Sequence, residues 1–442
     1  MEHSELKRIE DLEKQLEQMQ QEYMDLMESK TLSSMTGDIV IKSRKSVKGL
    51  VTMPFQILKL RKRFLNGEFR PKVHGFSRMT AGNPDLLVEK DAVMFMATNG
   101  VGLGHLTRCL SVARRMKDEM GVKKIVFLTT CPALHLIRNE GFIPFYVPSK
   151  EMFKNDITSS QWDELLMSAF QDMFALYQFG TIVFDGAIPY QSLAMVLENN
   201  TDINRVWIRR GSAKKSAQAS RQNSEVFFDH VIIPAEAGDE VPVSYDKYEF
   251  VKPIVYLNDE EQMDRAEVRK IFGVGDDQKL IYVQLGAGKI NNTENVLDTV
   301  LEILLEDKKN KIVIGQSPLG DELNYVNERI QIIKDYPNAK YFKGLDLAVS
   351  ACGYNSFHEL LYTKVPTVFL PNTKTGTDDQ VARALRSEAY GLGAVVTEPT
   401  RENIAEAVQK MMQSNIVKED IVLDFHGATE AANVIMKYHN EK

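Results

Sequence analysis

Two residues in the first half of the chain have side chains and positions suited to proton transfer. His105 closes a glycine-rich stretch, 98–105, and opens a helical pattern. A histidine at that place can accept a proton from a hydroxyl group near neutral pH. Asp185 ends an apolar run and precedes Gly186. It could orient His105, hold an acceptor hydroxyl or act as the base itself, and the sequence leaves these three roles open.

The segment 349–361 has the features of an anion-binding turn. An apolar run breaks at Gly353 and a helical pattern follows, with Asn355 or Ser356 as the expected N-cap. Free backbone N–H groups at a helix start are suited to phosphate oxygens. Glu359 lies further along, where it can meet a group attached to the phosphate, such as ribose hydroxyls. The alternative is an ordinary strand-to-helix turn with a surface glutamate.

Other loops after apolar runs carry groups that suit a sugar nucleotide. Gly286 and Gly288 let the backbone approach a pyrophosphate closely, and Lys289 adds a cation. One later loop contains carboxylate and amide side chains suited to sugar hydroxyls: Asp378, Asp379 and Gln380. The same three residues also suit the start of a helix. No Asp-x-Asp pair stands at a strand end, so we expect a diphosphate to be held without a metal or other cofactor.

The glycine loop before His105 is weakly diagnostic on its own. Its spacing is G-x-G-x-G-H, which differs from the dinucleotide fingerprint G-x-G-x-x-G. Residues expected to face phosphate or acceptor groups come from this loop, from the helix after it and from the end of the run 204–208: Gly102, Gly104, Arg108, Arg209 and Arg210. Solvated arginines are the ordinary alternative for the last two.

Two successive α/β units are needed to bring these loops together. Apolar runs alternate with helical patterns over 91–252 and again over 253–425, which predicts two parallel sheets with helices on both faces. The expected strands are 92–97, 124–129, 141–147, 181–185, 204–208, 250–256, 279–285, 311–315, 346–350, 365–370 and 394–397. Ligands of such sheets bind beyond the carboxyl ends of the strands, where the loops would surround one cleft.

The first 90 residues differ from the rest. Apolar residues at heptad spacing within 6–27 predict a coiled coil over 1–30, which favours a homo-oligomer over a helix packed on its own chain. Residues 31–90 form a basic amphipathic segment and linker. Eight cations and no acid lie between Asp38 and Glu68, which favours membrane contact through 40–66.

Two further expectations concern this basic segment. Pro54 should divide it into two short helices. The alternatives to membrane contact are a connector packed on the catalytic body and an RNA-contacting arm.

The composition excludes several classes of protein. The chain has 442 residues, 43% of them hydrophobic, and a formal net charge of −7, which argues against a general nucleic-acid binder. Cys109, Cys131 and Cys352 lie in apolar contexts, as buried reduced thiols do. We find no signal-peptide pattern and no long apolar segment, so we expect a cytoplasmic protein, peripheral on the inner face of the cell membrane.

Three motifs resemble those of the GT-B glycosyltransferases, which have two Rossmann-like domains facing a central cleft. They are Gly102-Leu-Gly-His105, Gly353-Tyr-Asn-Ser-Phe-His-Glu359 and Thr377-Asp-Asp-Gln380. The chain is similar to the branch that contains the peptidoglycan N-acetylglucosaminyltransferase acting on lipid I. It has Gly-Val-Gly-Leu-Gly-His where that enzyme has Gly-Thr-Gly-Gly-His, which leaves the acceptor open.

The resemblance implies inverting transfer from a UDP-sugar to an acceptor hydroxyl. The basic segment suggests that the acceptor is a lipid-linked or membrane-proximal glycan. It places Gly353, Tyr354, Asn355 and Ser356 around the diphosphate and Glu359 on the ribose. It places Phe342 or its neighbours near the uracil, and Asp379 and Gln380 on the transferred sugar. Residues 426–442 resemble the C-terminal helix that crosses back to the first domain. The alternatives are a nucleotide-sugar hydrolase, a 2-epimerase and a non-catalytic partner subunit that binds sugar nucleotides.

Overall fold

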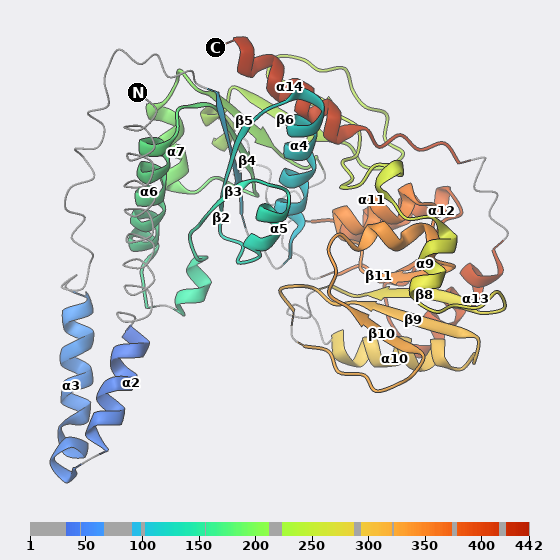
Figure 1. Cartoon of the computed structure of the whole chain (residues 1–442), viewed down its shortest axis with the longest axis horizontal. Coiled ribbons are helices and arrows are strands. Elements are labelled where there is room, and N and C mark those ends of the chain that lie inside the picture. The colour runs from blue at the N-terminus through green and yellow to red at the C-terminus, as the bar shows by residue number, and fades with distance from the viewer. Residues whose placement is uncertain are drawn as a thin grey trace, which may run out of the picture. The chain divides into compact units, whose positions relative to one another are not determined.

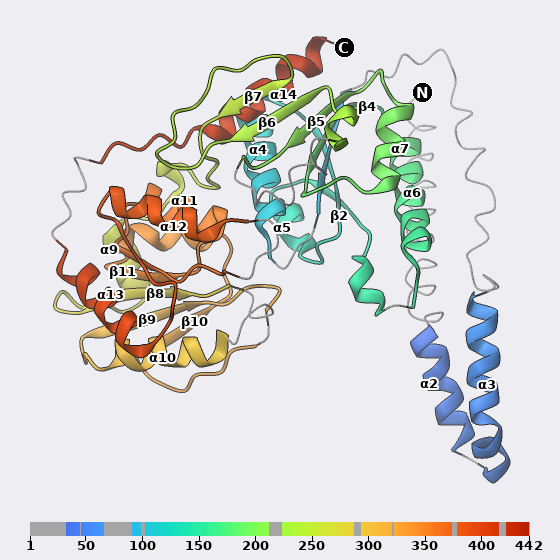
Figure 2. The same cartoon turned by 180° about the vertical axis from the view of Figure 1, so that it is seen from behind.

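The computed structural model describes residues 32–44, 46–65, 91–98, 102–154, 156–211, 223–286, 293–320, 322–373, 378–414 and 421–441 (Figures 1 and 2). The chain divides into two units, Met1–Pro84 and Asp85–Lys442. The expected coiled coil over 1–30 and the expected linker over 67–90 lie outside the described residues.

The second unit contains two parallel sheets. The first has the order β3-β2-β1-β4-β5-β6-β7. Its strands are β1 (Ala92–Ala97), β2 (Lys124–Thr129), β3 (Ile143–Tyr146), β4 (Phe179–Asp185), β5 (Asn204–Ile208), β6 (His230–Pro234) and β7 (Tyr248–Val251). The second has the order β10-β9-β8-β11-β12-β13. Its strands are β8 (Lys279–Gln284), β9 (Asn310–Gly315), β10 (Ile330–Ile333), β11 (Leu347–Ser350), β12 (Thr367–Phe369) and β13 (Gly393–Val395).

Helices cover both faces of each sheet, because the strands are buried on both sides. In β1, Val93 and Phe95 belong to one apolar cluster, whereas Met94 and Met96 belong to another on the opposite face. The helices of the first domain are α4 (Gly104–Met120), α5 (Leu134–Asn139), α6 (Ser159–Leu176) and α7 (Gln191–Asn199). Those of the second are α9 (Arg265–Ile271), α10 (Thr293–Leu305), α11 (Tyr354–Tyr362), α12 (Gln380–Ala389) and α13 (Arg401–Gln413).

The strand order reverses at one place in each sheet, and in both sheets the strands at the reversal lead to predicted site residues. In the first sheet the reversal lies between β1, which leads to His105, and β4, which ends at Asp185. In the second it lies between β8, which leads to Gly286, and β11, which leads to Gly353. Open parallel sheets bind ligands at such switch points.

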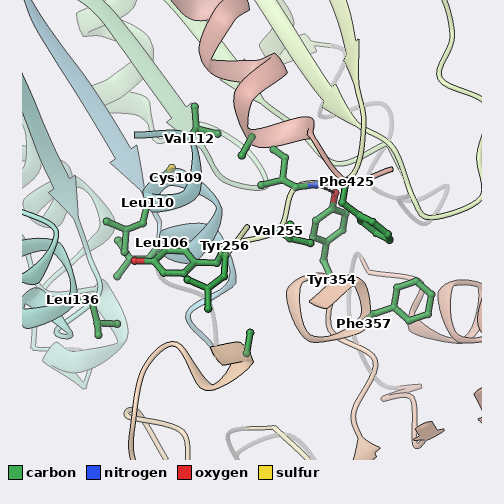
Figure 3. Close-up of a cluster of buried hydrophobic side chains, with 14 of the residues drawn as sticks. Leu106, Cys109, Leu110, Val112, Leu136, Val255, Tyr256, Tyr354, Phe357 and Phe425 are labelled. Carbon is green, nitrogen blue, oxygen red and sulfur yellow. Dashed lines mark hydrogen bonds between the residues drawn. The ribbon is translucent and has the colours of Figure 1, made fainter. Parts of the chain in front are cut away.

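One apolar cluster continues from the first domain into the second. Figure 3 shows side chains from α4, from the connecting segment and from α11 in this cluster, among them Leu106, Tyr256 and Phe357. The helix α14 (Gly427–Glu441) then returns to the first domain and contacts α4 and β7 (Figures 1 and 2). Asn204 of β5 donates a hydrogen bond to the backbone carbonyl of Tyr438 in α14.

The strands of the structure differ from the predicted strands at three places. The short strands β6 and β10 were not predicted, because runs of four or five residues resemble apolar loop segments. The strand expected over 250–256 ends at Val251. Residues 252–256 instead form the connection between the domains, and Val255 and Tyr256 are buried in the shared cluster.

Cys109, Cys131 and Cys352 are buried free thiols, as predicted.

The described part of the first unit is a pair of contacting helices, α2 (Leu32–Ser43) and α3 (Val47–Leu65). The prediction that Pro54 divides the basic segment is wrong, because Pro54 lies inside α3. The break falls before Val47, where the Ser46 hydroxyl accepts a hydrogen bond from the Gly49 N–H at 3.0 Å and so favours a helix start. Among the described residues, no helix is both long and apolar enough to cross a membrane.

Candidate active site at the domain junction

His105 and Asp185 form a hydrogen-bonded pair at the switch point of the first sheet. His105 lies in the first turn of α4, and its Nδ1 is 2.7 Å from Oδ1 of Asp185. Asp185 is completely buried, and Arg108, one turn further along α4, donates to both of its carboxylate oxygens. A carboxylate only accepts hydrogen bonds, so Nδ1 of His105 carries the proton and Nε2 has the free lone pair.

The surroundings keep this pair in the charge state that a general base needs. Burial alone would raise the pKa of Asp185, but Arg108 and His105 lower it below its usual value, so the carboxylate is ionised. Burial lowers the pKa of His105, which outweighs the opposing effect of Asp185. The imidazole is therefore neutral at physiological pH. Its side chain remains 20% exposed, whereas that of Asp185 is inaccessible.

The start of α11 faces this pair from the second domain. The helix begins at Tyr354 with Gly353 as its N-cap, so the expectation that Asn355 or Ser356 is the N-cap is wrong. Asn355 instead donates a hydrogen bond from Nδ2 to the carbonyl oxygen of Gly104, at 3.2 Å. The first residues of α4 and α11 therefore lie side by side.

Both helix starts have features of an anion site. No side chain caps either α4 or α11 by a hydrogen bond. A Cβ atom added at Gly102, Gly104 or Gly353 would meet no atom within 4 Å. Gly353 has a φ of −66°, so the backbone does not require glycine there. The absence of side chains at these positions instead leaves room for a ligand to approach the backbone.

Glu359 lies further along α11 in a half-buried position. Burial raises its pKa to about 8, although a hydrogen bond from the backbone of Tyr256 opposes that shift. Burial also raises the pKa of Tyr282 and Tyr336, and the neighbouring Glu359 carboxylate raises both further. Tyr336 donates a hydrogen bond to Oγ1 of Thr107 on α4, at 2.7 Å. Glu359 is thus a desolvated carboxyl group among tyrosines beside the domain junction.

The acidic loop before α12 also reaches the first domain. Asp378 pairs with Arg210 at 2.9 Å, and the two cations Arg210 and Arg383 lower its pKa to about 2 against the effect of burial. Asp379 caps α12 by accepting the Ala382 N–H at 3.1 Å. Gln380 accepts the N–H of Asn372 at 2.9 Å. In this arrangement Oδ1 of Asp379 and Oε1 of Gln380 hold the loop in place. The other carboxylate oxygen of Asp379 and the amide nitrogen of Gln380 could still contact a sugar.

The remaining candidates have varied positions. Arg209 pairs with Glu225, whereas the charge of Arg210 lowers the pKa of His105. Phe342 is only 2% exposed and packs against Tyr282, so its ring lies in the core. Gly286 has a φ of +91°, which favours glycine. Gly288 and Lys289 lie outside the described residues. In the described part of the chain, no group of three or more His, Cys, Asp and Glu side chains could hold a metal ion.

Sequence reasoning missed two charged residues that join these elements, Arg383 of α12 and Glu236 after β6. Arg383 is 1% exposed and pairs with Glu236, which is 4% exposed. Neither residue has a sequence signal, because an ion pair between distant segments leaves no periodic pattern. In addition, the strand before Glu236 was not predicted.

Comparison with known proteins connects this geometry to glycosyl transfer. Residues 288–420 match the model of the glycosyltransferase family 28 C-terminal domain. An uncharacterized glycosyltransferase of Methanopyrus kandleri is 27% identical over 219 residues, which are 47% of this chain and 60% of that protein. The match thus spans less than two thirds of the relative's length.

Solved structures match over a larger part of the chain. A calicheamicin glycosyltransferase superposes with a TM-score of 0.54 and 14% identity, over 80% of this chain and 99% of that one. A UDP-GlcNAc 2-epimerase of Methanocaldococcus jannaschii superposes with a TM-score of 0.52 and 12% identity, over 78% and 99%. These likenesses confirm the expected fold of two Rossmann-like domains.

Proposed function

We propose that this GT-B protein with a family 28 C-terminal domain transfers a sugar from a UDP-sugar to a hydroxyl of a membrane-associated glycan or lipid-linked acceptor. The observation that carries the proposal is the meeting of α4 and α11, because it brings a neutral, oriented histidine next to an uncapped helix start. The family 28 match supports glycosyl transfer in general, and the narrower similarity to the lipid I enzyme stays a prediction.

His105 is the base in this proposal, and Asp185 orients it. Nε2 takes the proton of the acceptor hydroxyl, whose oxygen attacks the anomeric carbon while the bond to the UDP oxygen breaks, which inverts the configuration. Asp185 fixes the tautomer and stabilises the imidazolium that forms. Direct attack by Asp185 on a proton is disfavoured, because its carboxylate is buried and engaged with Arg108 and His105.

The start of α11 holds the donor. Backbone N–H groups of Tyr354, Asn355 and Ser356 bind the diphosphate, and the helix dipole stabilises its charge as UDP leaves. Glu359 accepts hydrogen bonds from the ribose hydroxyls. Asp379 and Gln380 contact the transferred sugar, and no metal takes part.

Radiolabelled UDP-sugars incubated with and without isolated membranes test the reaction class. We expect label in the lipid or glycan fraction only when membranes are present. Stoichiometric free sugar without membranes would instead make the protein a hydrolase, and an isomerised UDP-sugar would make it an epimerase. No turnover under any condition would favour the non-catalytic subunit.

The helix pair α2–α3 supports a peripheral position on the inner face of the cell membrane. Phe55 and Leu58 on α3 are 79% and 62% exposed, and the neighbouring basic residues are exposed as well: Lys59, Arg61, Lys62 and Arg63. Exposed apolar side chains beside cations suit a surface of anionic lipid. Homo-oligomer formation through residues 6–27 is part of the same proposal and rests on the heptad spacing.

Flotation with lipid vesicles tests the membrane contact. The full chain should bind vesicles that contain phosphatidylglycerol and not vesicles of phosphatidylcholine alone. The double change Phe55→Ser and Leu58→Ser should reduce binding, whereas Val326→Ser, at a residue that is 97% exposed in the second unit, should not. Equal binding by all three proteins would contradict the proposed contact.

A further inference from the structure

Arg383 of α12 is a buried cation whose hydrogen bonds all go to the protein. Its guanidinium donates five: two to Glu236, two to Asp378 and one to the carbonyl oxygen of Cys352. The distances run from 2.8 to 3.2 Å. A guanidinium has five N–H donors, so none is left for a ligand. Arg383 therefore cannot bind a donor itself, and its effect must pass through the three groups that it holds.

The three groups belong to the parts that the proposed reaction needs. Cys352 directly precedes Gly353, so its carbonyl fixes the turn that starts α11. Asp378 belongs to the acidic loop and holds Arg210 of the first domain at 2.9 Å. Glu236 follows β6 and belongs to the first domain. One side chain thus ties the diphosphate turn, the acidic loop and the opposite domain together.

The neighbours of Glu236 reinforce this junction. The Tyr354 hydroxyl donates to the carbonyl oxygen of Ala235 at 3.1 Å. The N–H of Ala237 donates to Nε2 of His358 at 3.0 Å. Burial lowers the pKa of His358 to about 4, so the ring is neutral and can accept that hydrogen bond. Residues 235–237 are each bound to the second domain, and only the middle one uses a charge to do so.

We propose that Arg383 is a positioning residue that sets the start of α11 for the donor diphosphate, with Glu236 as its anchor in the first domain. This inference rests on the proposed function. It assigns specificity for the diphosphate to a residue that never touches it. Lysine cannot replace it, because an ammonium group has three donors and cannot reach three acceptors in the plane of a guanidinium.

The chain offers a matched control one turn along the same helix. Arg386 of α12 pairs with Asp239, three residues after Glu236, but these side chains are 31% and 41% exposed. Exposed pairs of this kind contribute little. Arg383→Lys and Arg386→Lys therefore make the same chemical change in the same two elements, and only the first reaches the α11 turn.

Isothermal titration of UMP and UDP into the full-length proteins tests the inference. For Arg383→Lys we expect about a tenfold loss of UDP affinity and less than about a twofold loss of UMP affinity. Arg386→Lys should bind both like the wild type. Partial unfolding lowers both affinities by one factor, so the ratio of UMP to UDP affinity separates positioning from stability. Equal losses for the two nucleotides, or no loss, would overturn the positioning role.

A second variant tests the positioning role of Arg383 if Arg383→Lys shows no cooperative thermal transition. Glu236→Gln keeps the shape of the anchor and removes its charge, and we expect about a threefold loss for UDP alone. An equal loss for UMP, or no loss, would again overturn the inference. A wild type that binds neither nucleotide would refute the proposed UDP donor itself, which is a different result from UDP binding without a selective effect of Arg383.

Discussion

The starts of α4 and α11 meet at the domain junction, and they differ in charge. The first turns of α4 carry His105 and Arg108, which are bound to the ionised, buried Asp185. The first turns of α11 carry neutral side chains, and its one acid, Glu359, has a pKa that burial raises to about 8. The first arrangement fixes a base in one charge state. The second provides backbone N–H groups and a carboxyl group that can bind the donor. In this way α4 serves proton transfer and α11 serves donor binding.

Loss of the base should have the largest effect. His105→Ala should lower kcat by about 10²–10⁴-fold, because positioned general bases contribute that much, and should leave UDP affinity unchanged. The assay is UDP release from a UDP-sugar in the presence of isolated membranes. An unchanged kcat would contradict the role of His105 on α4 as the base.

Loss of the carboxyl group on α11 should have the opposite pattern. Glu359→Ala should weaken UDP binding by about 2–10-fold, because the hydrogen bonds of a neutral carboxyl group are worth about 0.5–1.5 kcal/mol. At saturating donor, kcat should stay within a few-fold of the wild type. Titration calorimetry measures the first quantity. A variant that binds UDP normally but fails to turn over would reverse the roles of the two helices.

Much of this comparison could be predicted from the sequence, because it depends on local patterns. The strand-loop-helix units before His105 and around Gly353 are visible as apolar runs that end in glycine, and the structure places both at switch points. The start of α11 was misplaced because Asn355 is a favoured N-cap type, whereas its side chain is used across the junction. Arg383 and Glu236 were missed because an ion pair between distant segments leaves no periodic signal.

A methyl group at the start of α11 should separate stability from binding. Gly353→Ala should stabilise the fold by about 0.4–1 kcal/mol, because its φ of −66° suits alanine and the unfolded chain loses freedom. UDP affinity should fall by about tenfold, since the methyl group would lie where the diphosphate approaches. Gly275→Ala, at an exposed glycine away from both helix starts, is the control for binding. Thermal unfolding with and without UDP measures both effects.

The smallest expected effect concerns the pH dependence of stability. The pKa of Glu359 is about 8 in the folded protein against an ordinary 4.5, so the folded state holds its proton more tightly than the unfolded state. The contribution of Glu359 to the free energy of unfolding is therefore complete below about pH 4.5 and is lost as the pH rises through about 8. Glu359→Gln should remove this loss, so that its Tm exceeds that of the wild type by about 2–4 °C at pH 8.5 but not at pH 4.5. Parallel Tm curves for the two proteins would contradict the desolvation of Glu359.

A crystal structure of the full chain with UDP tests the division of work most directly. We expect the diphosphate to lie on the backbone N–H groups of Tyr354, Asn355 and Ser356. We also expect the ribose hydroxyls to lie within hydrogen-bond distance of Glu359, and Nε2 of His105 to face the space beyond the β-phosphate. A diphosphate bound away from the start of α11, or a ribose that does not reach Glu359, would contradict this division of work between α4 and α11.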